Sequence, residues 1–393
     1  MATGQHEEGG LSIAMLGTRG VPARYGGFET AVEEVGRRLA ARGHQVRVYC
    51  RSGNVPDAGD EYLGMALVSL PSLRTRSFET LSHTGLSVGH LLARRADVAF
   101  VFNAANAPFL PLLQAARIPV ATHVDGLEWQ RAKWSGAGRR YYRAAEGWAV
   151  RWSDALIADA VGIADYYRHE FGVPTTLLRY GAPILQGAGF DRLPELDLEP
   201  RGYHLVVARF EPENHVDLAV SGYVASRARL PLVVVGSAPY ADEYTRRVHA
   251  AARCSSRVRF LGPVWDQEQL DQLYAHAATY IHGHSVGGTN PSLLRAIGAG
   301  AATVAYDVGF NREVLNEDGR YFHAETELAR HLEDAERDPA VTLERGRRLQ
   351  QRARLYDWDE VATGYERLAR DLAGRAAPGR QRARRRPVVG DRR

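Results

Sequence analysis

The chain has 393 residues, of which 45% are hydrophobic and 24% charged, and its formal net charge at pH 7 is +4. This length exceeds that of a usual single core and predicts two compact domains. No apolar run approaches the roughly 18 to 20 residues of a membrane-spanning helix, and the first residues lack the pattern of a secretory signal. The two cysteines, Cys50 and Cys254, lie far apart. We therefore expect a cytoplasmic protein without disulfides or a cysteine zinc site.

Positive charge is concentrated at the C-terminal end, where eight arginines fall within residues 375–393. A segment so rich in Pro, Gly and Arg predicts a disordered tail over residues 374–393. The alternative is a peripheral contact of this tail with anionic lipid at the inner face of the plasma membrane. Nucleic acid is not expected as a partner.

The first half of the chain shows alternating strand and helix patterns. The run LSIAML predicts a buried strand, a glycine-rich loop and a helical stretch follow, and QVRVYC predicts the next strand. Further apolar runs, VAFVF, PVATHV and DALIA, alternate with helical segments. This pattern predicts a Rossmann-like domain with a parallel sheet over residues 1–182.

The pattern restarts after a segment that lacks clear periodicity. Residues 183–202 mix Pro, Gly and acidic side chains, which is typical of an interdomain linker. The runs HLVVA, PLVVVG, VRFLG, TYIHG and ATVAY then predict a second Rossmann-like domain over residues 203–373. Its last helical stretch, from Trp358 to Leu372, could pack back across the first domain. The fold class is therefore α/β, with two Rossmann-like domains facing across a cleft.

The strongest local signal is HGHSVGGTNPSLL, which follows a strand of the second half. Gly287, Gly288, Thr289 and Asn290 precede Pro291, and Asn before Pro is a favourable start for a helix. Backbone N–H groups at such a start attract anions, and two glycines allow close approach to the backbone. We expect a diphosphate to bind here; an ordinary capped loop is the alternative.

A second motif of the same half, VARFEPENHVD, places three charged side chains after a strand. Arg209 could bind phosphate oxygens in a forked geometry. Glu211 and Glu213 could orient this arginine or bind sugar hydroxyls. The alternative for Arg209 is a surface ion pair.

The opening loop GTRGVPARYGGFE ends in Gly26 and Gly27 just before a helix, so it too could face an anion. The spacing is not GxGxxG, and the next strand ends without the acidic residue that would hold a ribose. NAD binding is therefore not expected, although Arg51 keeps an NADP site open as an alternative.

The motif THVDGLEWQRAKW comes at the end of the buried run PVATHV, directly before a helical region, at the edge where α/β folds bind ligands. It supplies His123, Asp125, Glu128, Arg131 and Lys133. We expect Asp125, and after it His123, to contact the acceptor or move a proton, and Glu128 to bind sugar or acceptor; each could instead be a structural polar group. No spacing of His, Cys or acidic residues predicts a metal site, and no cofactor is expected.

Taken together, these four motifs resemble those of the retaining GT-B glycosyltransferases of family 4, and in particular a bacterial rhamnosyltransferase-like branch of surface polysaccharide assembly. The resemblance covers nearly the whole chain except the tail. It implies a metal-independent transfer with retention, from a nucleotide diphosphate sugar in the C-terminal half to a saccharide or lipid-linked saccharide in the N-terminal half. It also implies that Arg209 and the backbone of Gly288 to Asn290 hold the diphosphate while Gly26 and Gly27 close over it.

The chain departs from the family pattern at three positions. The family carries Glu, seven residues, then Glu, where this chain has Gly287 and Arg295, and a phosphate-binding lysine where this chain has Asn214. Arg295 lies four residues beyond Pro291, so we hypothesise that its side chain points back to the phosphates. The departures leave two alternatives to a transferase open: a catalytically silent subunit that binds nucleotide sugar, and a nucleotide-sugar epimerase.

Overall fold

The structure is a computed structural model that describes residues 9–23, 26–53, 59–73, 79–124, 126–131, 134, 136–237, 242–252 and 255–376. Asp125, Lys133, Cys254 and the arginine-rich residues from 377 onward lie outside the described residues. Within the described part, no helix combines the length and the apolar character needed to cross a membrane.

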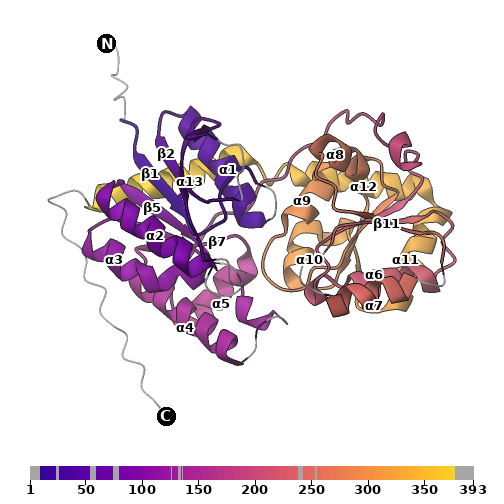
Figure 1. The fold of residues 1–393 in the computed structure, drawn as a ribbon. Coiled ribbons are helices and arrows are strands. Elements are labelled where there is room, and N and C mark those ends of the chain that lie inside the picture. The colour runs from indigo at the N-terminus through magenta and orange to yellow at the C-terminus, as the bar shows by residue number, and fades with distance from the viewer. Residues whose placement is uncertain are drawn as a thin grey trace.

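The chain forms two α/β domains side by side, each built on a mostly parallel sheet (Figure 1). This confirms the predicted fold class. The first sheet has the order β3-β4-β2-β1-β5-β6-β7-β8. Its strands are β1 (Ser12–Leu16), β2 (Gln45–Arg51), β3 (Glu61–Tyr62), β4 (Met65–Leu70), β5 (Val98–Phe102), β6 (Val120–His123), β7 (Ala155–Ala158) and β8 (Thr176–Leu177). Only the short β3 runs antiparallel to its neighbour.

The second sheet is parallel throughout and has the order β11-β10-β9-β12-β13-β14. Its strands are β9 (His204–Val207), β10 (Leu232–Val235), β11 (Val258–Gly262), β12 (Thr279–His282), β13 (Thr303–Tyr306) and β14 (Arg320–Phe322). In both sheets the strand order reverses beside the first strand. Loops leaving the carboxyl ends of the strands diverge at such a point and open a crevice for ligands.

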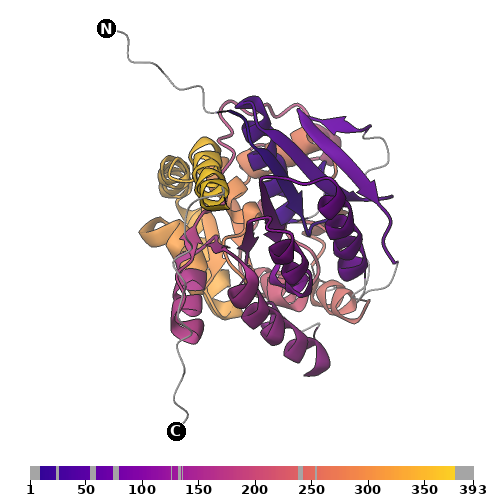
Figure 2. The ribbon, with the colours of Figure 1, turned by 90° about the vertical axis from the view of Figure 1, so that its left-hand side faces the viewer.

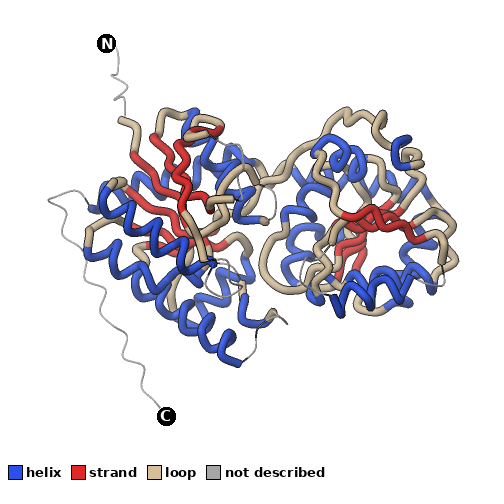
Figure 3. The backbone as a smooth tube through the Cα atoms, viewed as in Figure 1, coloured by secondary structure: helices blue, strands red, loops and turns tan. Residues whose placement is uncertain are grey.

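Helices cover both faces of each sheet, as the tube drawing shows (Figure 3). The central strands are buried on both faces, which accounts for continuous apolar runs such as β5 (VAFVF). The helices of the first domain are α1 (Gly27–Ala41), α2 (Glu79–Ala93), α3 (Leu110–Ala115), α4 (Gly136–Trp152) and α5 (Val161–Phe171). Those that follow are α6 (Val216–Ala225), α7 (Asp242–Ala252), α8 (Gln267–Ala275), α9 (Pro291–Gly298), α10 (Gly309–Leu315), α11 (Glu325–Arg337), α12 (Pro339–Ala353) and α13 (Trp358–Ala376).

The last helix, α13, returns to the first domain and lies along the flank of its sheet (Figures 1 and 2). Arg42, which directly follows α1, donates to Glu366 of α13 at 3.0 Å, and the Tyr365 hydroxyl lies 3.0 Å from Nδ1 of His123. At its start, the Trp358 ring covers Gly181, where a Cβ atom would lie 2.3 Å from the indole. The C-terminal helix is therefore part of the core of the first domain.

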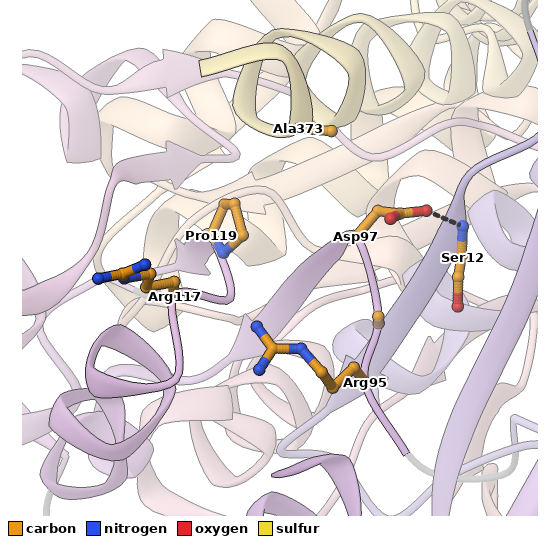
Figure 4. Close-up of a pocket in the computed structure, with 7 residues that line it drawn as sticks. Ser12, Arg95, Asp97, Arg117, Pro119 and Ala373 are labelled. Atoms are coloured by element: carbon orange, nitrogen blue, oxygen red, sulfur yellow. Dashed lines mark hydrogen bonds between the residues drawn. The ribbon is translucent and has the colours of Figure 1, made fainter. Parts of the chain in front are cut away.

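A cavity of about 370 Å³ opens at the amino ends of β1, β5 and β6 (Figure 4). It is lined by Ser12, Arg95, Ala96, Asp97, Arg117, Pro119 and Ala373. The Ser12 N–H donates to Asp97 at 2.8 Å on one wall. Because ligands of α/β folds bind at the carboxyl edge, this cavity lies at the wrong end of the sheet for the predicted donor site.

Gly181→Ala should destabilise the protein by about 1–3 kcal/mol, because the added methyl group would overlap the Trp358 ring and force α13 outward. Thermal unfolding followed by circular dichroism measures this change. Gly147→Ala is the matched control, since no atom lies within 4 Å of the added Cβ in α4. It should be neutral or stabilising by about 0.5–1 kcal/mol. Equal melting temperatures for the two variants would contradict the proposed role of this contact.

Candidate functional site

Three loops meet where the two domains face each other. They follow β6, β9 and β12 at the carboxyl edges of their sheets, and they carry the predicted motifs. Ser285 of the loop after β12 donates its backbone N–H to the carbonyl of Glu213 at 2.9 Å, which joins the two loops of the second domain. From the first domain, Gly126 approaches the backbone of Gly287, where a Cβ atom at Gly126 would lie 3.1 Å from the carbonyl carbon.

The glycine loop before α9 offers unsatisfied backbone donors. Asn290 caps the helix as predicted, and its side chain accepts the N–H of Ser292 at 2.9 Å. Pro291 has no N–H, so the first N–H of the helix is that of Ser292, and it is already hydrogen-bonded to the cap. However, the backbone N–H groups of Gly287, Gly288, Thr289 and Asn290 make no hydrogen bond to any described residue. These four consecutive groups form a better candidate for anion binding than the first turn of the helix.

The two domains touch directly on either side of this loop. A Cβ atom at Gly27 would lie 3.3 Å from the Pro291 ring, so the predicted opening loop reaches the start of α9. Thr289 donates its hydroxyl to the carbonyl of Asp159 at 3.1 Å. Gly288 lies so close to the Asp159 carboxylate that a Cβ atom there would be 2.2 Å from Oδ1. Gly26 precedes Gly27 as the N-cap of α1. Both predicted glycine loops therefore lie at one interdomain boundary.

A cluster of charged side chains crosses the same boundary. Arg209 is half exposed and lies 3.6 Å from Glu211. From the first domain, Arg131 contacts Glu128 at 2.6 Å and approaches Glu213 at 3.7 Å and Glu211 at 3.9 Å. The structure thus brings together the predicted cation, the predicted sugar-binding acids and Arg131, which the motif had supplied without a role.

Asn214, which replaces the lysine of the family pattern, is almost fully buried and uses its whole amide group inside the protein. Its Nδ2 donates to the carbonyl of Arg209 at 2.8 Å, and its Oδ1 lies 2.8 Å from Nδ1 of His284. The side chain therefore fixes the loop that carries Arg209 against the loop after β12.

His123 lies in the core of the first domain rather than on an open surface. Its Nδ1 bonds the Tyr365 hydroxyl, and its ring packs against Phe28 and Phe102 at centroid distances of 5.1 and 5.5 Å. Desolvation by burial lowers the pKa of His123 to about 3, so the ring is neutral near pH 7. Nε2 makes no hydrogen bond to a described residue.

Arg295 forms an ion pair with Asp271 of α8. The two side chains are comparably and only partly exposed, and Asp271 also accepts from Gln267 at 3.0 Å. The guanidinium hypothesised to reach back to the phosphates is thus engaged by a neighbouring helix.

Two further interdomain contacts were not predicted. Glu313 of α10 accepts from Arg179 at 3.0 Å and from the backbone N–H of Val161, at the start of α5, at 3.1 Å. Asp159 contacts the glycine loop, as described above. A signal for Asp159 exists in the sequence, because it directly follows the buried run ALIA. Glu313 lies in a helix and carries no comparable signal. Among the described residues, no group of three or more His, Cys, Asp or Glu side chains is placed to hold a metal ion.

Acid should destabilise the folded protein, because His123 and His282 are buried in the neutral form. Burial lowers the pKa of His123 and His282 to about 3, against 6.5 in an unfolded chain. Between these values the unfolded chain binds more protons, so stability falls as the pH drops, by at most about 1.4 kcal/mol per pH unit and histidine. We expect the melting temperature to fall from pH 7 to pH 5, and less steeply in His123→Asn. An unchanged slope in that variant would show that His123 does not titrate in this way.

The two halves of the chain match two family models. Residues 26–181 match the glycosyl transferase 4-like domain, and residues 194–356 match glycosyl transferases group 1. Glycogen synthase of Mycobacterium tuberculosis is 27% identical over 392 aligned positions, covering 90% of this chain and 93% of that protein. O-antigen chain mannosyltransferase B of Escherichia coli is 26% identical over 40% of this chain and 45% of its own length.

Solved structures of low identity share the fold over nearly the whole chain. Sucrose-phosphate synthase from Thermosynechococcus elongatus superposes with a TM-score of 0.79 at 20% identity, covering 93% of this chain and 99% of that chain. The Anabaena protein HepE, in complex with UDP-glucose, superposes with a TM-score of 0.74 at 17% identity, covering 93% and 100%. The two domain matches and the shared two-domain fold identify this chain as a glycosyltransferase of the GT-B type.

Proposed function

We propose that the protein transfers a sugar from a nucleotide diphosphate to a saccharide or lipid-linked saccharide, with retention of anomeric configuration, in surface polysaccharide synthesis. In this proposal residues 203–373, apart from the returning helix α13, bind the donor, residues 1–182 bind the acceptor and residues 183–202 link them. The presence of UDP-glucose in the HepE structure supports a nucleotide-sugar donor. A rhamnose donor is supported only by the resemblance of the four motifs.

The observation that carries the proposal is the row of four backbone N–H groups from Gly287 to Asn290 that lack partners among the described residues. They lie beside the N-terminus of α9, whose dipole also favours negative charge. A diphosphate bound there would satisfy these donors. Arg209 adds a cation at the edge of the site. Arg295 would join them only if it exchanged Asp271 for a phosphate oxygen.

Catalysis in this arrangement rests on stabilisation of the leaving group. The bond from the anomeric carbon to the diphosphate oxygen breaks, and the diphosphate keeps the electron pair. Preorganised donors at Gly288 to Asn290 and at Arg209 meet the charge as it develops, and no metal ion is required. The acceptor oxygen bonds the anomeric carbon on the face that the diphosphate leaves, and its proton passes to the carboxylate of Asp125. We propose Asp125 as its first contact, while the neutral imidazole of His123 would serve as a hydrogen-bond partner.

The acidic residues of the charged cluster suit hydroxyl recognition. Glu211 and Glu213 lie on the donor side and Glu128 on the acceptor side, and Arg131 stands between them. Carboxylate oxygens accept hydrogen bonds from sugar hydroxyls. A lipid-linked acceptor would require a peripheral position at the inner face of the plasma membrane, and we propose that the arginines of residues 375–393 favour it.

A catalytically silent subunit is the second candidate, and two observations favour it. Arg295 is engaged by Asp271, and the amide of Asn214 is used inside the protein. Donor turnover separates the two functions. Full-length protein is incubated with UDP-, GDP- and dTDP-sugars, a lipid-linked acceptor pool and, in parallel, EDTA. A transferase should turn over one donor with or without EDTA, whereas saturable binding without turnover would support the silent subunit. Absence of binding would refute the donor site itself.

Gly288→Ala should weaken binding of the nucleoside diphosphate product by roughly ten-fold or more. The methyl group would overlap the Asp159 carboxylate and displace the backbone donors. Calorimetric titration measures the affinity. Gly89→Ala, on an exposed face of α2 with no atom within 4 Å of the added Cβ, is the control. Equal affinities for the two variants would show that the loop does not hold the diphosphate.

Retention is tested on the product. The anomeric coupling in the NMR spectrum of the first product, recorded before any equilibration, should show the configuration of the donor. The opposite anomer would mean that the acceptor attacks from the far face of the sugar, and would exclude the mechanism above.

A further inference from the structure

Arg131 is a residue of the first domain whose charge is directed at the second. It follows the short helix η2 (Glu128–Gln130), and its guanidinium approaches Glu213 and Glu211 across the boundary at 3.7 and 3.9 Å. The same Oε2 atom of Glu211 lies 3.6 Å from Arg209. One carboxylate oxygen is thus shared by two guanidinium groups, one from each domain.

The loops around this pair bring it to the predicted diphosphate site. Ser285 donates both its N–H and its hydroxyl to the carbonyl of Glu213, at 2.9 and 3.1 Å. This fixes the Glu213 loop beside the glycine loop. Burial lowers the pKa of His284, which lies three residues before Gly287, and the charges of Arg131 and Arg209 add to this shift. The positive charges of both guanidinium groups therefore reach His284, which lies between the end of β12 and the glycine loop.

We propose that Arg131 is the second cation on the donor diphosphate, supplied by the acceptor-side domain. Arg131 supplies the positive charge that the family's lysine would provide at position 214. Asn214 cannot supply it, because its amide is neutral and already hydrogen-bonded through both its nitrogen and its oxygen. This inference rests on the proposed function, since it names a further residue of the same donor site. Arg131 differs from Arg209 in belonging to the other domain.

The charges of the cluster explain how the site exchanges partners. Three carboxylates, Glu128, Glu211 and Glu213, surround the two arginines. An incoming diphosphate adds negative charge, so it is accepted only if it replaces a carboxylate at the guanidinium groups. Glu211 is the one to yield, because it is the most exposed of the three and both arginines share it. Released, it is available to the hydroxyls of the donor sugar.

The position of Arg131 also makes closure of the domains a condition of catalysis. Its Nε stays 2.6 Å from Glu128, so the guanidinium remains oriented by its own domain. It can reach the diphosphate only when the two domains are in contact, as an arginine supplied from outside a phosphate site does in other enzymes. The same contact brings the acceptor loop that contains Arg131 to the donor.

The test measures the affinities of UDP, GDP and dTDP, and of the matching monophosphates, by calorimetric titration. For the nucleoside diphosphate that wild type binds, Arg131→Gln should lower the affinity by roughly ten-fold or more. It should also lower kcat about 10²-fold. Its effect on the monophosphate should be much smaller. The diphosphate affinity of Arg131→Lys should lie between those of wild type and Arg131→Gln, since lysine keeps the positive charge but lacks the forked donors of the guanidinium group. The control Arg168→Gln removes an equally charged but exposed side chain of α5 and should change neither affinity.

Glu211→Gln provides a result of opposite sign. Removal of the competing carboxylate should raise the affinity for the nucleoside diphosphate several-fold. This gain in affinity should be lost in the double variant with Arg131→Gln. A residue that only holds its loop in place through Glu128 would change neither the preference for diphosphate over monophosphate nor the response to Glu211→Gln. If Arg131→Gln does not fold, Arg131→Lys and Glu211→Gln still give the comparison.

The outcomes separate this inference from the proposed function. If wild type binds none of the nucleoside diphosphates, the proposed donor site is wrong and the inference falls with it. If wild type binds one of them and Arg131→Gln binds it equally well, Arg131 is not a diphosphate ligand although the donor site stands. Unchanged or weaker diphosphate binding in Glu211→Gln would likewise overturn the exchange of partners.

Discussion

The structure depends on how closely the two parallel sheets can bring the carboxyl ends of their strands together. Three glycines set this distance. Gly27 meets Pro291, Gly126 meets the backbone of Gly287, and Gly288 lies against Asp159. A side chain at Gly288 would hold the domains apart, because the nearest atoms belong to Asp159 and Ile163 of the first domain. The close approach of backbone to backbone leaves N–H groups of the glycine loop as the polar surface of the boundary.

Charge is arranged around this boundary as a ring of opposed partners rather than as a positive pocket. Arg131, Arg209, Glu211 and Glu213 come from both domains. A short distance away, Glu313 closes a second contact with Arg179 and the first turn of α5. Salt bridges of this kind contribute little to stability when exposed. At a partly buried boundary, removing one partner of such a pair is more costly, because it leaves an uncompensated charge.

Much of the fold could be predicted from the sequence, because the central strands of parallel sheets are buried on both faces and appear as continuous apolar runs. The runs VAFVF, HLVVA and TYIHG coincide with β5, β9 and β12. The edge strands β3 and β8 have only two residues each and leave no such run. Motif positions at strand ends were also readable, since strand direction places them. Side-chain partners were not: nothing in the sequence links Arg295 to Asp271, or buries His123 beneath Tyr365, which lies 242 residues further along the chain.

The return of α13 to the first domain has a consequence during protein synthesis. The core around His123 is closed by Tyr365, and the turn at Gly181 is covered by Trp358. Both covering residues belong to the last helix of the described chain. A nascent chain that has emerged only as far as residue 182 therefore lacks one wall of its first domain. Domains generally fold as units in the order of their synthesis, but here the first domain completes its core last, after the second has been made.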